Sequence, residues 1–220
     1  QEYPGVDDYE AHFYAILDAL TDSRYITVDG KPVFVVFHPV EFPEPLQFTD
    51  LWRNLAVKAG LKGLYLVGIA HQGWQPAKFG YDACCVDYFS TARRAIDARH
   101  TEKPAQRPSR YAYEAIIRNA FPAEGYADNQ MPCVIPNWDN TPRSAADGVV
   151  FEDCTPELFG EHLRHAIRLI EHRPRDRRLL FLKSWNEWAE GNYLEPDREF
   201  GRRYLEALRN ALITGPNHRD

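Results

Sequence analysis

Short apolar runs alternate with longer amphipathic stretches along this chain. Two runs, residues 32–37 and 64–69, are almost continuously apolar, which is typical of strands that are buried on both faces of a sheet. The pattern predicts further strands at residues 132–135 and 179–182, and a weaker one at residues 83–88. Strands of this kind belong to parallel sheets whose two faces are covered by helices.

The stretches between these runs carry apolar residues at helical spacing. The first follows Asp7 and Asp8, either of which can cap a helix, and its apolar positions recur at i, i+3, i+4 and i+7: Phe13, Ile16, Leu17 and Leu20. Thr49 is predicted to cap a second helix, and Thr155 followed by Pro156 marks the start of a third. Shorter helices are predicted near residues 113–120 and 204–212, whereas residues 91–109 show no period and are predicted to form a long loop.

The alternation of strands and helices predicts an α/β fold with parallel strands. A complete (β/α)8 barrel needs eight strands and typically about 250 residues, whereas four good strands and one weak strand are found here. The sequence therefore predicts either the C-terminal half of a TIM-barrel-like (β/α)8 fold or a complete open sheet. A half barrel would leave an unpaired, apolar sheet edge exposed.

Charge and length narrow the function classes. The 220 residues include 26 Lys+Arg and 32 Asp+Glu, and this net charge of −6 argues against nucleic acid or an anionic membrane as the partner. No apolar run approaches the ~18–20 residues that a transmembrane helix needs. Because the first residue is Gln1 rather than Met, the chain begins either after processing or part-way through a longer protein, and we expect the second.

Cysteine and histidine spacings favour neither a metal site nor a redox centre. The four cysteines form no C-x-x-C pair and no disulfide framework, which favours a reducing compartment and predicts a cytoplasmic location. The histidines at the predicted strand ends lack an H-x-H or H-x-x-x-H partner, and the sequence contains no phosphate-binding glycine loop and no G-x-S-x-G. We therefore predict that the protein uses no metal and no cofactor.

Ligands of parallel α/β folds bind at the carboxyl ends of the strands. That rule selects the polar and aromatic residues that follow the predicted strands: His38, Pro39, His71, Gln72, Trp74, Asp87, Tyr88, Trp138, Asp139, Asn140 and Arg143. The richest segment follows the last strand, and its candidates for substrate binding are Trp185, Asn186, Trp188, Tyr193 and Glu195. Aromatic faces stack on the C–H faces of sugars while amides and carboxylates bind the hydroxyls, so this composition predicts a carbohydrate site.

Glu187 and Glu190 are the candidate catalytic pair. If the chain turns helically after the strand, their spacing of three places both carboxylates on one face, about 5–6 Å apart at Cβ. Retaining glycosidases use two carboxyl groups about 5–5.5 Å apart. The plain alternative is two solvated surface glutamates, but the large aromatics beside them favour a site. We expect the pair to share one cleft with Trp138, Asp139 and Trp185.

Five segments resemble one known family. S-W-N-E-W-A-E-G-N-Y-L-E-P-D (184–197) resembles the WbsX family of bacterial polysaccharide-biosynthesis proteins, which are also described as glycoside hydrolase family 99-like. The same order is kept by R-Y-I-T-V-D-G-K-P-V-F-V-V-F-H-P (24–39), P-N-W-D-N-T-P-R (136–143), T-P-E-L-F (155–159) and G-R-R-Y-L-E-A-L (201–208). The resemblance implies that residues 1–220 form a single domain, N-terminally truncated, from the C-terminal part of a (β/α)8 barrel.

The resemblance also implies roles for the two glutamates. Family 99 endomannosidases have N-E-W-H-E-G at the matching place, where the first Glu deprotonates the sugar 2-hydroxyl to give a 1,2-anhydro intermediate and the second is the acid/base. By position these roles fall on Glu187 and Glu190. This chain has Ala189 where those hydrolases have His, which leaves hydrolysis and transfer both open.

Three hypotheses of function follow. The first is an enzyme of bacterial surface polysaccharide (O-antigen or lipopolysaccharide) biosynthesis or processing, acting as a glycoside hydrolase or a glycosyltransferase. Its partners would be an oligosaccharide or polysaccharide and, for a transferase, an activated sugar donor. The second is a catalytically silent glycan-binding module that keeps the barrel cleft. The third is a scaffolding partner in a polysaccharide assembly complex.

Overall fold

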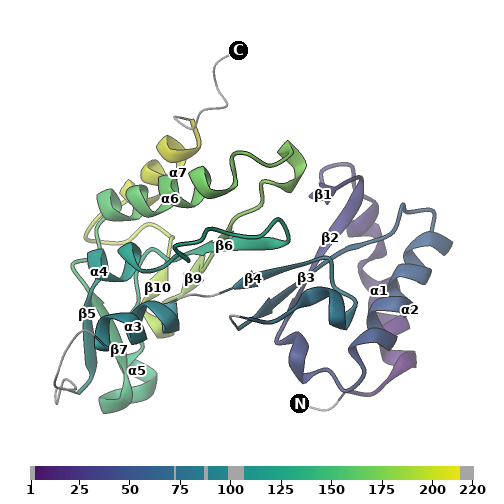
Figure 1. Cartoon of the computed structure of the whole chain (residues 1–220), viewed down its shortest axis with the longest axis horizontal. Coiled ribbons are helices and arrows are strands. Elements are labelled where there is room, and N and C mark those ends of the chain that lie inside the picture. Colours follow the sequence, from purple (N-terminus) through teal and green to yellow (C-terminus); the bar gives the residue numbers. More distant parts are fainter. Residues whose placement is uncertain (1–2, 72, 87–88, 99–106, 214–220) are drawn as a thin grey trace. The chain divides into compact units, whose positions relative to one another are not determined.

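The computed structural model describes residues 3–71, 73–86, 89–98 and 107–213 (Figure 1). The chain divides into two compact units: the first comprises residues 1–87, 127–131 and 175–177, and the second comprises residues 88–126, 132–174 and 178–220. Both units combine helices with parallel strands, which confirms the predicted α/β class. None of the helices in the described part of the chain is long and apolar enough to cross a bilayer.

The first unit contains a sheet with the strand order β1-β2-β3-β4. Its strands are β1 (Thr27–Val28), β2 (Lys31–Phe37), β3 (Tyr65–Ala70) and β4 (Ala83–Val86). The short β1 pairs antiparallel with β2, whereas β2, β3 and β4 are parallel, with Val33 opposite Tyr65 and Val67 opposite Ala83. The strands predicted at 32–37 and 64–69 are therefore confirmed to within one residue, and the weaker candidate forms β4.

Two helices pack on this sheet (Figure 1). The helical elements of the unit are α1 (Val6–Thr21), α2 (Pro45–Lys58) and the 3₁₀ turns η1 (Pro39–Glu41), η2 (Pro76–Phe79) and η4 (Arg175–Arg177). Trp52 of α2 is fully buried, and its ring centroid lies 4.5 Å from that of Phe34 on β2 and 5.6 Å from that of Phe13 on α1. The buried indole N–H donates to the carbonyl of Tyr9 at 3.0 Å, so burying the ring leaves no polar group without a hydrogen bond.

The starts of both helices differ from the prediction. Helix α1 has Gly5 at its N-cap, and Asp7 and Asp8 lie inside its first turn, where their charge favours the positive end of the helix dipole. Thr49 does not cap α2, because Pro45 starts the helix one turn earlier with its ring-fixed φ. The buried Thr49 hydroxyl instead donates to the carbonyl of Leu46 at 3.1 Å.

The second unit holds three pairs of strands. The strands are β5 (Ser109–Ala112), β6 (Gln130–Val134, of which residues 132–134 belong to this unit), β7 (Val149–Glu152), β8 (Phe181–Leu182), β9 (Asn186–Glu187) and β10 (Asn192–Tyr193). The β6–β8 and β5–β7 pairs are parallel, whereas β9 and β10 form an antiparallel hairpin. The strands predicted at 132–135 and 179–182 correspond to β6 and β8.

The helices of the second unit build its core. They are α3 (Phe89–Asp97), α4 (Tyr113–Arg118), α5 (Thr141–Ser144), α6 (Pro156–Ile170) and α7 (Arg203–Ile213), with the 3₁₀ turns η3 (Ala145–Asp147) and η5 (Trp188–Glu190). Helices α6 and α7 lie side by side (Figure 1), and Phe159 and Tyr204 bring them together in one apolar cluster that includes Val134 of β6. The predicted cap of α6 is confirmed, because Thr155 Oγ1 accepts from the backbone N–H of Leu158 at 3.3 Å.

The prediction of a long loop over residues 91–109 is wrong for its described parts. Helix α3 begins at Phe89 and buries Phe89 and Ala92, so its basic residues occupy the remaining positions of an amphipathic helix. At the other end, Ser109 starts β5, which pairs with Val149 some forty positions later in the sequence. Such a pairing leaves no local periodicity to detect. Residues 99–106 lie outside the described part.

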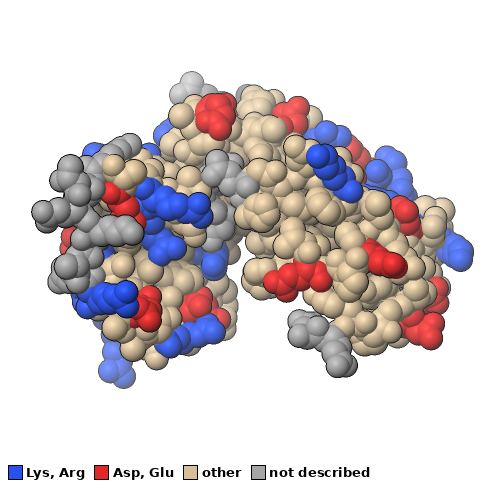
Figure 2. Space-filling view, turned by 60° about the horizontal axis from the view of Figure 1, so that its bottom comes forward, with Lys and Arg blue, Asp and Glu red and all other residues tan. Residues whose placement is uncertain are grey.

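Charged side chains of both signs are interspersed on the surface. On the face shown in Figure 2, Lys and Arg side chains lie next to Asp and Glu side chains. Several of these form ion pairs, such as Arg110–Glu152 at 2.9 Å and Arg24–Asp22 at 2.6 Å. Exposed pairs of this kind contribute little to stability, typically about 0–1 kcal/mol, and mainly keep the surface hydrated.

Candidate active site

The candidate carboxylates lie on a hairpin that follows β8. Strand β9 ends at Glu187, the 3₁₀ turn η5 ends at Glu190, and β10 returns antiparallel with Asn192 opposite Glu187. The sequence predicted a helical turn at this place, and the structure has a single 3₁₀ turn. The turn spans Trp188–Glu190 and Glu187 is its N-cap, so the two glutamates lie at the two ends of this turn.

Gly191 makes the return of the hairpin possible. Its φ of +50° lies in the left-handed region, and its N–H donates to the carbonyl of Trp188 at 3.0 Å, which closes η5. A Cβ at this position would lie 2.9 Å from Cβ, N and O of Asp139. Both the backbone conformation and the close approach therefore require glycine.

We expect Gly191→Ala to lower the free energy of unfolding by about 2–4 kcal/mol, because backbone strain and a steric clash add at one position. Gly125→Ala is the matched control, since Gly125 also has a positive φ of +80° but a Cβ added there would meet nothing within 4 Å. Urea unfolding followed by tryptophan fluorescence measures both. Equal losses in the two variants would show that the contact with Asp139 does not constrain the hairpin.

Buried amides fix the hairpin to the strand ends. The Asn192 side chain, which is fully buried, donates to the carbonyls of Asn137 at 2.8 Å and Lys183 at 2.9 Å. Asn137 Oδ1 in turn accepts from the N–H of Tyr193 at 2.9 Å, and Ser184 Oγ donates to the carbonyl of Asn192 at 2.8 Å. Asn137, Asn192 and Ser184 were not predicted as site residues. They position the segment that carries the glutamates.

Glu190 is anchored at both its backbone and its side chain. Its carbonyl accepts from the N–H of Asp139 at 2.8 Å, and its Oε1 accepts from Arg143 Nη1 at 2.8 Å. The Glu190 side chain is 22% exposed, whereas Glu187 is exposed and donates its backbone N–H to Ser184 Oγ at 3.2 Å. The two glutamates therefore have different surroundings, which is a common feature of carboxylate pairs with separate catalytic roles. Arg143, predicted to bind substrate, contacts the candidate acid/base.

Two predicted binding residues use their side chains on the protein itself. Asp139 Oδ1 accepts from the N–H of Thr141 at 2.9 Å and from its hydroxyl at 2.6 Å, which holds the start of α5. Asn140 Oδ1 accepts from the N–H of Val149 at 2.7 Å, which ties the same loop to β7. Both residues thereby fix the loop that carries Arg143 beside Glu190.

Aromatic side chains flank the hairpin. Trp185 and Trp188 are 52% and 48% exposed, respectively. The Trp188 ring stacks on Tyr193, with centroids 3.8 Å apart and an interplanar angle of 15°, and its Nε1–H donates to Glu195 Oε2 at 2.8 Å. Trp138 is half-buried, and the ammonium of Lys183 lies 4.8 Å from the centre of its ring. Asn186, on β9, is exposed.

Burial and nearby carboxylates raise the pKa of Tyr193. Desolvation contributes most, followed by the charges of Asp197 and Glu199. Burial likewise raises the pKa of the Cys154 thiol to about 12 and that of Cys84 to about 11, so neither supplies a thiolate near neutral pH. No group of three or more His, Cys, Asp or Glu residues in the described ranges could hold a metal ion.

Most of the remaining predicted residues belong to the first unit. His38 and His71 follow the parallel strands β2 and β3, and both are exposed. His38 has a φ of +52°, and its Nδ1 lies 3.2 Å from Glu41 Oε1. Trp74, selected by the same rule, is buried under Gly68, where an added Cβ would lie 2.6 Å from its ring, and so belongs to the core. Gln72, Asp87 and Tyr88 lie outside the described residues.

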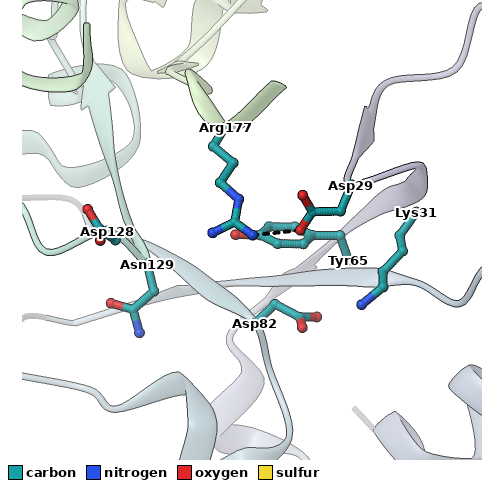
Figure 3. A pocket seen from close by; sticks show the side chains of 7 residues that line it. All are labelled: Asp29, Lys31, Tyr65, Asp82, Asp128, Asn129 and Arg177. Atoms are coloured by element: carbon teal, nitrogen blue, oxygen red, sulfur yellow. Dashed lines mark hydrogen bonds and ion pairs between the residues drawn. The ribbon is translucent and has the colours of Figure 1, made fainter. Parts of the chain in front are cut away.

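A polar pocket lies at the opposite, amino ends of the strands of this unit. Its cavity of about 270 Å³ is lined by the residues shown in Figure 3: Asp29, Lys31, Tyr65, Asp82, Asp128, Asn129 and Arg177. Asp29 and Arg177 point toward one another and form an ion pair at 2.6 Å, and Asp82 pairs with Arg53 at 2.7 Å. Because functional sites of such folds lie at the carboxyl ends of the strands, this pocket is best explained as a stabilising network.

Comparisons with known proteins agree with the sequence motifs. A family model described as Glycosyltransferase WbsX matches residues 1–208. An uncharacterized protein WxcX of Xanthomonas campestris pv. campestris (strain B100) is 29% identical over 223 residues, which cover 96% of this chain and 31% of that protein. The chain thus spans about a third of the length of the curated relatives it matches, since the same protein from a second strain gives the same coverage.

A solved structure shares the fold. A glycoside hydrolase-like protein superposes with a TM-score of 0.63 and 17% sequence identity, over 93% of this chain and 60% of that one. At this level of identity the likeness concerns the arrangement of strands and helices alone.

Proposed function

This chain belongs to the WbsX glycosyltransferase family, and we propose that it is part of a carbohydrate-active enzyme that cleaves or transfers a glycosidic bond of a bacterial surface polysaccharide. Glu187 and Glu190 are the proposed carboxylate pair. The observation that carries the proposal is the β9–η5–β10 hairpin, in which one 3₁₀ turn joins the two glutamates and two exposed indoles flank them. The activity of the whole protein, of which this chain is a part, is proposed with it.

We further propose that the chain supplies the C-terminal half of a (β/α)8 barrel. Three parallel strands in the first unit and the parallel β6–β8 pair in the second support that architecture. The proposed site residues follow the carboxyl ends of these strands, where barrel enzymes bind their substrates. In the first unit, His38 and His71 are proposed as sugar-binding residues. A cytoplasmic location stays a prediction.

The proposed chemistry uses the two carboxylates in turn. Glu187 removes the proton of the sugar 2-hydroxyl, whose oxygen attacks C1, while Glu190 protonates the leaving oxygen as the C1–O bond breaks. In the second step Glu190 takes a proton from the incoming hydroxyl, that hydroxyl opens the 1,2-anhydro ring at C1, and Glu187 returns the proton to O2. Water gives hydrolysis and a sugar hydroxyl gives transfer. Arg143 orients the Glu190 carboxylate for both proton transfers.

A catalytically silent glycan-binding module is the second candidate. The exposed Trp185 and the stacked Trp188–Tyr193 pair favour it, because aromatic platforms bind sugars without any proton transfer. Product formation separates the two functions. Incubating the intact protein with defined mannosides and with sugar nucleotides, and following products by mass spectrometry, should reveal a shortened or an extended glycan. Binding of glycans without any product would favour the module.

A further inference from the structure

We propose that the second unit carries a stacking subsite for a second sugar ring, formed by Trp188 and Tyr193 and walled by residues 196–199. The inference rests on the proposed function, because it states where the neighbouring residue of an oligosaccharide binds when the reacting sugar lies at Glu190. It makes the substrate a chain of at least two sugars rather than a simple glycoside.

The subsite is a cavity beside the hairpin. It has a volume of about 550 Å³ and is lined by Trp188, Tyr193, Pro196, Asp197, Arg198 and Glu199. This volume lies within the range of about 300–1,000 Å³ that is usual for small-molecule sites. Its lining combines two aromatic rings and a proline with charged side chains, which is the composition that a sugar ring needs: apolar faces for its C–H groups and polar groups for its hydroxyls.

The aromatic floor is held rigidly. Tyr193 covers one face of the Trp188 ring at 3.8 Å, and Glu195 holds the indole N–H at 2.8 Å, yet Trp188 remains 48% exposed. About half of Trp188 therefore stays open although Tyr193 covers one of its faces. A ring that is fixed in this way loses little conformational entropy when a ligand stacks on it, which favours binding.

The rest of the lining belongs to a closed turn. Asp197 and Gly201 form a two-way backbone bridge, and Asp197 Oδ1 accepts from the N–H groups of Glu199 at 2.9 Å and Phe200 at 2.5 Å. These bonds fix the backbone of residues 197–201, so the exposed Arg198 and Glu199 side chains of the lining stand on a rigid base. A donor and an acceptor side by side suit the vicinal hydroxyls of a sugar.

The position of the subsite determines its role. Trp188 and Glu190 belong to the same 3₁₀ turn, and Arg143 fixes the Glu190 carboxylate through its Oε1. We therefore place the second sugar on Trp188 and the reacting sugar at Glu190, two positions further along the same turn. Because binding energy from such a remote ring can be used in the transition state, its loss should reduce turnover of oligosaccharides more than that of monosaccharide glycosides.

The test compares binding and turnover in the intact protein. Calorimetry with manno-, gluco- and galacto-oligosaccharides of one to six residues should show affinity rising with the second sugar for at least one series. Trp188→Ala should remove the increase in affinity that the second sugar gives, which we expect to be about tenfold or more. Trp188→Phe should keep most of this increase because an aromatic ring remains. Tyr14→Ala is the matched control, since Tyr14 is an aromatic residue of α1 that is 55% exposed. Thermal unfolding of each variant confirms that it is folded.

The outcomes separate this inference from the proposed function. If Trp188→Ala binds and turns over oligosaccharides like the unaltered protein, the subsite is absent while the proposed enzyme stands. If no product forms with any glycan but Trp188→Ala still loses the gain from the second sugar, the subsite stands and the proposed enzyme fails. If no series shows saturable binding, or if affinity does not depend on chain length, the subsite is overturned.

Discussion

Replacing Glu190 or Glu187 by Gln in the intact protein is expected to lower turnover of its glycan substrate by ~10²–10⁴-fold, the usual contribution of general acid–base catalysis. The amide keeps the shape and much of the hydrogen bonding of the carboxylate, so both variants should still bind the sugar. The loss should therefore appear in kcat, with little change in affinity. Steady-state kinetics and calorimetry measure the two quantities separately.

The two roles predict an asymmetry between the variants. A substrate whose leaving group needs no protonation should partly restore turnover by Glu190→Gln but not by Glu187→Gln, because only Glu190 is assigned to the leaving oxygen. A 2-deoxy substrate should be inert even to the unaltered enzyme if the reaction passes through the 1,2-anhydro sugar.

Glu161→Gln, an exposed substitution on α6 away from the hairpin, is the control and should leave turnover unchanged. Full activity in both Gln variants would refute the carboxylate pair.

Local signals in the sequence predicted the parts of the fold that depend on local chemistry. The runs at 32–37 and 64–69 form β2 and β3, and Thr155 caps α6. Both features can be predicted because an apolar run and a capping hydroxyl are patterns of residues that are close together in the sequence. The β5–β7 pair was missed, because its register, with Ser109 opposite Val149, depends on residues far apart in the chain. Residues 91–97 were predicted as part of a loop for a different reason: α3 buries Phe89 and Ala92 and has too few apolar positions to show a helical period.

In the candidate site, too, the sequence predicted some of the residues but not the contacts between them. The rule of strand carboxyl ends placed Asp139, Arg143 and Glu190 among the candidates, and the structure joins them through two hydrogen bonds. The sequence did not indicate that Arg143 contacts Glu190, forty-seven positions away. It also did not indicate that Asn137 and Asn192 brace the hairpin, because an asparagine in a turn and a buried asparagine have the same sequence signal.

His162 gives the second unit a predictable sensitivity to acid. Its side chain lies on α6 among the rings of Phe89, Tyr113 and Phe121 and is 1% exposed, and neither ring nitrogen makes a hydrogen bond of ordinary geometry with any described residue. Burial lowers its pKa to about 3, and the nearby charge of His165 contributes in the same direction. The folded protein therefore keeps this imidazole neutral at pH values where the unfolded chain would protonate it.

Stability should fall as the pH drops from about 6.5, the ordinary histidine value, toward 3. In this window the unfolded chain binds a proton at residue 162 that the folded chain does not, so protonation favours unfolding. Between about pH 7.5 and pH 4.5 the loss from this single group is on the order of 3 kcal/mol. His162→Leu, which is similar in volume and cannot be protonated, should remove that part of the pH dependence.

Urea unfolding of the unaltered protein and of His162→Leu at the two pH values measures this difference, and His172→Leu, at an exposed position, controls for the removal of a histidine. Between pH 7.5 and pH 4.5, the unfolding free energy should fall by about 3 kcal/mol more in the unaltered protein than in His162→Leu. Above about pH 7 this contribution of residue 162 should be absent. The NMR signal of the His162 ring should not titrate down to about pH 4, since its neutral form persists until the pKa near 3. Two results would contradict this account: a titration of that ring near pH 6.5, or the same pH dependence of the unfolding free energy in both proteins. Either would mean that a proton reaches residue 162 in the folded state, so that the apolar packing of α6 does not control its charge.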